Sequence, residues 1–117
     1  MRTIIAASFA IALTLGVAGA SAKSPDEILC NDANAVSGDS LACGGGVIRL
    51  HGITAPAPQT AEGDASRAAL QRIIRLRMTR CLVRDHIDAR LNVATCFVNG
   101  RSLADRQLRA GHATSSR

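Results

Sequence analysis

The stretch Val36 to Pro58, with the sequence VSGDSLACGGGVIRLHGITAPAP, is the part of the chain from which we predict the fold. It holds one acidic residue, Asp39, in a Ser-Gly-Asp-Ser turn, and one arginine, Arg49, inside an otherwise apolar run. A charge left unpaired inside a strand is costly, so Arg49 must meet an anion or reach solvent. An outward-facing arginine on a half-exposed strand explains the pattern as well as an anion site does.

The residues around this turn predict a three-stranded meander. By propensity alone Ile28 to Val36 is a loop, and only the expected disulfide and the family resemblance given below argue for a strand. The Ser37-Gly38-Asp39 turn follows, and Ser40 to Cys43 returns. The three glycines at 44–46 turn the chain again, and Val47 to Gly52 has the strongest strand pattern.

After the meander, the prolines at 56 and 58 force an extended path into a helix that we expect from Thr60 or Glu62 to Met78. Four apolar residues share one helical stripe, with Leu70 and Ile74 beside it: Ala65, Ala69, Ile73 and Leu76. The arginines of this helix fall mostly off the stripe, where they form either a solvated surface or a phosphate-binding one.

The last third of the chain predicts a second strand pair and a short helix. The strands are Cys81–Val83 and Leu91–Val98, joined by a turn over 85–90. Ser102 opens a capping box for a helix that runs to Ala110, and Gly111 ends it. The order is therefore three strands, a helix, two strands and a helix.

The two motifs of the opening stretch resemble those of the thermonuclease, or staphylococcal-nuclease-like, family. Family members carry Asp-Gly-Asp-Thr and then Arg-Leu-x-Gly-Ile-Asp-Ala-Pro-Glu, where this chain has Ser-Gly-Asp-Ser at 37–40 and Arg-Leu-His-Gly-Ile-Thr-Ala-Pro-Ala at 49–57. The resemblance covers residues 29–113. It implies a mainly β fold with α, an OB-type five-stranded barrel with one longer and one short helix.

The resemblance also implies roles for individual residues. Asp39 matches a calcium-binding aspartate, Arg49 matches the first phosphate-binding arginine, and Arg90 is the candidate for the second. Thr54 stands where the second calcium aspartate would be, and Ala57 where the general-base glutamate would be. We therefore expect calcium to bind weakly, and the loss of the base to lower the rate by roughly 10²- to 10⁴-fold.

His51 is the remaining candidate near this site. In a regular strand it would project from the same face as Arg49, which would place an imidazole beside the phosphate site. A histidine at the edge of the barrel is the alternative.

The first 22 residues have the pattern of a secretory signal peptide, with Arg2, an apolar segment from Ile4 to Val17 and an Ala-Ser-Ala cleavage site. Residues 23–28 then form a flexible leader and residues 114–117 a disordered tail. We expect a secreted or periplasmic monomer that makes no membrane contact after cleavage.

Without Arg2, 13 basic residues face 9 acidic ones, and 12 of the basic residues are arginine. This bias fits an anionic partner, and it also fits arginine-rich codon usage.

All four cysteines lie in the expected mature chain, where an oxidising compartment favours disulfides. Three pairings are possible. Two antiparallel hairpins would place Cys30 opposite Cys43 and Cys81 opposite Cys96, and we predict these two bonds. A zinc site is the alternative, but the chain has no Cys-x-x-Cys pair.

Three functions remain open from the sequence. The first is a secreted nuclease-family enzyme with weak or lost phosphodiester hydrolysis. The second is a non-catalytic OB-fold module that binds nucleic acid or another anionic partner through Arg49, Arg90 and the helix arginines. The third is a small disulfide-stabilised protein with a protein partner. Scarce aromatic residues count against strong single-strand binding by base stacking.

Overall fold

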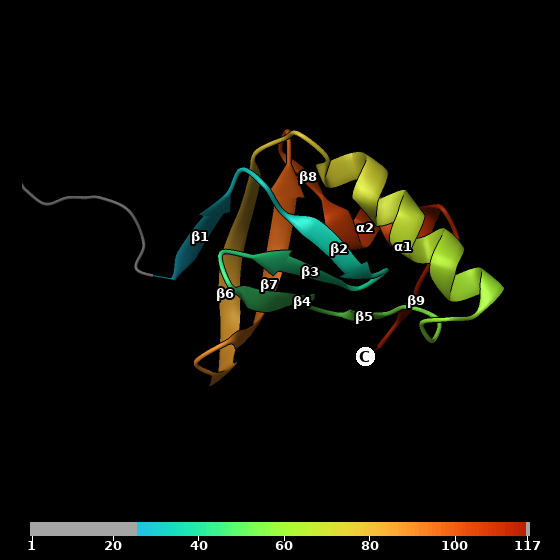
Figure 1. Ribbon diagram of the computed structural model, residues 1–117, viewed down its shortest axis with the longest axis horizontal. Helices are drawn as coiled ribbons and strands as arrows, with labels where there is room; N and C mark the ends of the chain where they lie inside the picture. Colours follow the sequence, from blue (N-terminus) through green and yellow to red (C-terminus); the bar gives the residue numbers. More distant parts are fainter. Residues whose placement is uncertain (1–25, 117) are drawn as a thin grey trace, which may run out of the picture.

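The computed structural model describes residues 26–116, which form a mainly β structure with two helices (Figure 1). The strands are β1 (Glu27–Cys30), β2 (Asn34–Ser37), β3 (Ser40–Cys43), β4 (Gly46–Leu50), β5 (Ile53–Thr54), β6 (Thr79–Asp88), β7 (Leu91–Val98), β8 (Arg101–Ser102) and β9 (Thr114–Ser115). The helices are α1 (Ala61–Ile74) and α2 (Leu103–Arg109). The expected signal peptide, residues 1–22, lies outside the described residues.

The main sheet is mixed and curls into a half-barrel. Its strand order is β1-β6-β7-β4-β3-β2, with β8 paired to β7. β4 runs parallel to β7, and the other pairs are antiparallel. β1 and β2 are separated by residues 31–33 alone, yet they lie at opposite ends of this order, so the two edges of the sheet must approach each other.

This topology confirms the mainly β prediction and changes two of its details. The segment from Ile28 to Val36 is not one strand, because the polar residues at 31–32 divide it into β1 and β2. β1 pairs with β6, so the meander consists of β2, β3 and β4. The leader was expected to be flexible to residue 28, but Glu27 and Ile28 already pair with β6.

Helix α1 begins where the sequence predicts and ends earlier. The hydroxyl of the N-cap Thr60 accepts a hydrogen bond of 3.0 Å from the Gly63 amide, but the helix ends at Ile74 instead of Met78. The predicted stripe is wrong at both ends, since Ala65 and Leu76 are exposed. The buried face is Gly63, Ser66, Ala69, Leu70 and Ile74. It packs on β2, which lies along the helix in Figure 1.

The end of the chain follows the prediction to Gly111 and then departs from it. The hydroxyl of Ser102 caps α2 by accepting from the Asp105 amide at 3.2 Å, and Gly111 follows the helix with φ of 78°. The tail was expected to be disordered beyond residue 113, but Thr114 and Ser115 pair with β5. β6 also continues to Asp88 through two register shifts, where a turn was expected from residue 85.

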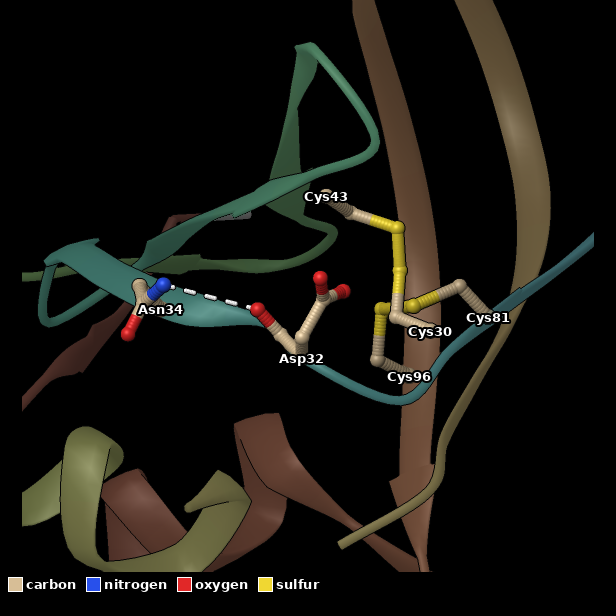
Figure 2. The surroundings of a disulfide bond; sticks show 6 residues. All are labelled: Cys30, Asp32, Asn34, Cys43, Cys81 and Cys96. Carbon is tan, nitrogen blue, oxygen red and sulfur yellow. Dashed lines mark hydrogen bonds between the residues drawn. A yellow bond between two sulfur atoms is a disulfide. The ribbon is translucent and has the colours of Figure 1, made fainter. Parts of the chain in front are cut away.

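Both predicted disulfides form, and they join the core cluster of the half-barrel (Figure 2). Cys81 and Cys96 are directly opposite each other on β6 and β7, as the hairpin argument predicts, with Cα atoms 4.0 Å apart. The hairpin argument fails for the other bond, because Cys30 lies on β1 and Cys43 on β3, with Cα atoms 6.0 Å apart. That bond ties one edge strand to the opposite side of the curled sheet. Two disulfides fit an oxidising compartment.

Residues 26–116 contain no helix that is both long enough and apolar enough to span a bilayer.

Helix α1 supplies a stability prediction at its first turn. Glycine to alanine usually stabilises a helix by about 1 kcal/mol. At Gly63, however, an added Cβ would lie 1.9 Å from the Ala57 carbonyl oxygen. We therefore expect Gly63→Ala to destabilise the protein by about 2 kcal/mol in urea unfolding. Ala65→Gly, at an exposed position of the same helix, is the control, and it should cost about 1 kcal/mol. A stabilised Gly63→Ala variant would show that the Ala57 loop moves freely.

Candidate functional site

The Ser-Gly-Asp-Ser turn is inserted between the two helices and the loop after β5. Ser37 and Ser40 pair across it, so Gly38 and Asp39 form its tip. An added Cβ at Gly38 would lie 1.7 Å from the Ser66 hydroxyl of α1. The Gly38 carbonyl accepts a 2.9 Å hydrogen bond from the side-chain amide of Gln107 on α2. Glycine is needed here because the turn and α1 approach closely.

The Asp39 carboxylate is buried, with 8% of the residue exposed, and its oxygens are occupied by protein donors. Oδ1 accepts from the hydroxyls of Ser37 and Ser40 at 2.8 and 3.1 Å. Oδ2 accepts from the Ala55 amide at 2.8 Å. A carboxylate offers about four lone-pair positions, and three are used. Asp39 therefore fixes the turn to the segment that leaves β5.

These contacts decide the protonation state of Asp39. Burial raises the pKa of its carboxyl, but three hydrogen bonds and one charge outweigh burial and bring the pKa below the ordinary value of 3.8. The hydrogen bonds come from Ala55, Ser37 and Ser40, in decreasing order of effect, and the charge is that of Arg49. Asp39 is therefore ionised at neutral pH.

Arg49 is brought next to this turn by the sheet. It lies on β4, directly opposite Ser40 on β3 and Val93 on β7, and it is exposed. Its charge is close enough to lower the pKa of Asp39, but the two side chains form no ion pair within 4.0 Å. A guanidinium held this way remains available to an external anion.

Thr54 lies on β5, next in sequence to the Ala55 amide that binds Asp39. Its backbone carbonyl accepts from the Thr114 hydroxyl at 3.4 Å, and the residue is exposed. Thr54 immediately precedes Ala55, whose backbone amide binds the Asp39 carboxylate, but the Thr54 hydroxyl is neutral and adds no charge to the site.

Arg90 lies at the turn between β6 and β7, away from Asp39. Its carbonyl accepts a 2.7 Å hydrogen bond from Val47 at the start of β4, and it borders a hollow lined by the glycines at 44–46. The register pairs Val93 with Arg49, and Arg90 lies three residues before Val93, just outside the start of β7, about 10 Å away at strand spacing. The structure therefore places Arg49 near Asp39 and leaves Arg90 at the end of the sheet, while Thr54 precedes the residue whose amide binds Asp39.

The argument that placed His51 beside Arg49 does not hold. It required a regular strand through residue 52, but β4 ends at Leu50 and Gly52 turns the chain with φ of 86°. His51 is exposed, and its amide donates to the Ala94 carbonyl at 2.9 Å. Strand alternation says nothing about a side chain in a turn.

Two buried polar residues behind the turn were missed in the sequence. Gln107 is 1% exposed, and its amide nitrogen donates to Gly38, to the Ser66 carbonyl and to the Ser66 hydroxyl. Ser66 in turn donates to the His112 carbonyl at 2.7 Å. The sequence contains one signal for these two residues: each helix has a polar residue, Ser66 in α1 and Gln107 in α2, on its buried face. Because these bonds join segments far apart in sequence, only the fold identifies the partners.

Calcium does not fit this site in the way that the resemblance implies. Calcium takes six to eight oxygen ligands, whereas the Asp39 carboxylate has about one lone-pair position left and Thr54 supplies a neutral hydroxyl. No three His, Cys, Asp or Glu side chains gather into a metal-binding group within residues 26–116. We derive no chemistry through calcium, and its weak binding stays a prediction.

Neither a protein-family model nor a curated protein sequence matches the chain.

Proposed function

We propose that this protein is a secreted, thermonuclease-like module of OB type that binds the phosphate groups of nucleic acid and hydrolyses them weakly or not at all. One observation carries the proposal: the carboxylate expected to take part in catalysis is buried and hydrogen-bonded, while the arginine beside it is exposed. Phosphate binding requires the arginine, and hydrolysis would require both groups.

The sheet topology supports the OB-type part of the proposal. An OB barrel closes when its first strand pairs with strands on both sides. Here β1 and β2 follow each other in the chain, separated by residues 31–33, and they pair with β6 and β3 respectively. The parallel pairing of β4 with β7 brings the Arg49 strand next to the C-terminal half of the sheet.

The residues around Arg49 support binding over catalysis. Ala57 has a methyl side chain, which cannot accept a proton. Its backbone carbonyl accepts a 2.7 Å hydrogen bond from the hydroxyl of Thr60, the N-cap of α1, so this loop positions the start of the helix. Within residues 26–116, Arg49 has no carboxylate within 4.0 Å that would compete with a phosphate. The guanidinium can therefore form a bidentate pair with one phosphate group.

The test is to measure nucleic-acid binding and cleavage with the same samples. Oxidised protein is titrated into fluorescent single-stranded DNA and RNA at several salt concentrations, with calcium or with a chelator. We expect salt-sensitive binding without cleavage. Arg49→Ala should weaken binding about tenfold and lower the salt slope by about one unit, because one phosphate contact is lost. Arg49→Lys should restore the slope and only part of the affinity.

Arg109→Ala is the matched control, since it removes the same charge from an exposed position on α2. An equal loss in both variants would place binding at the helices and contradict the role of Arg49. Calcium-dependent cleavage that Arg49→Ala abolishes would instead support the enzyme. Binding that neither variant changes would refute the proposed site.

A further inference from the structure

The turn after α1 exposes two apolar side chains, Leu76 and Met78, of which the helical stripe predicted Leu76 to be buried. Because α1 ends at Ile74, the next residues leave the core: Leu76 is 89% exposed and Met78 is 50% exposed. Exposed leucines are common one at a time, but two large apolar residues in one turn form a feature that folding does not explain.

The backbone of Leu76 makes its exposure more unusual. Leu76 has φ of 58°, in the left-handed region that follows many helices and that usually holds glycine. The Arg75 amide donates to the backbone carbonyl of Gln71 at 3.0 Å, and the Arg77 amide donates to the carbonyl of Ile74 at 3.1 Å. These hydrogen bonds fix the turn. A leucine is disfavoured in this conformation, and its side chain makes no compensating contact with the core.

Arg75 and Arg77 flank Leu76 in the sequence, and Arg77 also lines a groove that holds further arginines. A groove of about 480 Å³ between α1 and α2 is lined by Arg72, Arg77, Arg101, Arg106, Arg109 and His112. Met78 shares a neighbouring hollow with Asn99 and Gly100, which places the apolar turn beside the turn between β7 and β8. Figure 1 shows both turns at the same end of the molecule, above the helices.

The charge of this surface is not neutralised by the described part of the chain. None of its arginines forms an ion pair within 4.0 Å with a described carboxylate. The acidic residue in an adjoining depression is Asp105, which stands beside Arg101, Arg106 and Arg109. Clustered guanidinium groups with one carboxylate among them produce a strongly positive potential, which attracts an extended anionic partner.

We propose that this end of the protein is a binding surface for anionic lipid headgroups. We define the lipid-binding surface as Leu76 and Met78 together with the arginines at 72, 75, 77, 101, 106 and 109. Leu76 and Met78 enter the boundary between headgroups and acyl chains, and the arginines bind lipid phosphates. This goes beyond the proposed function, because it uses none of the residues around Asp39.

The exposed apolar side chains favour a membrane surface over nucleic acid at this end. Contact with a phosphodiester backbone removes little apolar surface of Leu76 and Met78 from water, whereas insertion into the acyl region of a bilayer removes much of it and is favourable. Aromatic rings do not distinguish the two partners, because His112 lines the groove and Phe97 lines the neighbouring hollow. From the sequence we predict no membrane contact after signal cleavage, and the helical stripe places Leu76 in the core.

The test is vesicle sedimentation with oxidised protein starting at Lys23, which retains every described residue and lacks the apolar N-terminal segment. Vesicles contain phosphatidylcholine alone or with phosphatidylglycerol. We expect binding only when phosphatidylglycerol is present, and weaker binding at high salt. Leu76→Asn should weaken binding about tenfold, since one buried apolar side chain is lost. Arg101→Ala should weaken it about fivefold.

The controls separate binding from folding. Asparagine tolerates the left-handed conformation, so Leu76→Asn should melt at the same temperature as the unmodified protein or higher. Arg49→Ala should bind vesicles normally, whatever its effect on nucleic acid. Equal binding to phosphatidylcholine vesicles, no vesicle binding, or unchanged binding by Leu76→Asn would overturn the proposal. Binding of single-stranded DNA that depends on Arg101, without vesicle binding, would assign the surface to nucleic acid instead.

Discussion

Replacing Asp39 with alanine is expected to destabilise the protein by about 3 kcal/mol at neutral pH, which lowers the melting temperature by about 12 to 24 °C. The substitution removes three hydrogen bonds to a charged group. It also leaves the Ala55 amide without its acceptor, and this amide lies in the segment between β5 and α1. Calorimetry or urea unfolding measures the loss.

The matched control is Ser37→Ala, which removes one of the three donors and leaves the carboxylate in place. It should cost about 1 kcal/mol. If Asp39→Ala were no more destabilising than Ser37→Ala, the carboxylate would not be the group that holds the turn. Asp39 would then be free for ligand binding, and the argument against catalysis would lose its basis.

The stabilisation by Asp39 should also depend on pH. Its folded pKa lies below 3.8, so the contribution is fully present above pH 3.8 and is lost as the pH falls through the folded pKa. Asp39→Asn lacks this titration. The difference in unfolding free energy between the unmodified protein and Asp39→Asn should therefore be constant from pH 7 to about pH 5 and shrink below pH 3.8. A difference that grows in acid would contradict the sign of the shift.

Removing the disulfide between Cys81 and Cys96 is expected to have an effect of similar size. A bond that closes a loop with a sequence separation of 15 contributes about 3 kcal/mol. Both cysteines are almost fully buried, so replacing both with alanine also leaves a small cavity. We expect the double alanine variant to lose about 4 kcal/mol, measured by urea unfolding of oxidised protein.

The Cys30 and Cys43 double alanine variant is the comparison. Its loop is of similar length, but Cys43 is only partly buried, so the expected loss is about 3 kcal/mol. This loss should be accompanied by faster hydrogen exchange in β1, because the bond ties that edge strand to β3. Unchanged exchange in β1 would mean that its pairing with β6 alone holds it. A melting temperature within 2 °C of the unmodified protein for either variant would contradict its prediction.

Local patterns predicted the elements that depend on local forces. The capping hydroxyl of Ser102, the glycine turns and the strand from Val47 to Leu50 each follow from chemistry within a few residues. The cysteine pairing also followed, although for Cys30 the geometric reason was wrong. The stripe that included Leu76 failed because no glycine or proline follows Ile74 to mark the end of the helix, and the residues that do follow it are compatible with a helix.

The sequence by itself determined a mainly β chain with two helices and two disulfides, since strand periodicity, caps and cysteine spacing are properties of short segments. Only the tertiary structure decided that Asp39 is buried among Ser37, Ser40 and Ala55, that Leu76 is exposed, and that arginines from several segments line one groove. These surroundings come from segments up to tens of residues apart. Burial and hydrogen bonding depend on which segments meet, and a linear pattern does not contain that information.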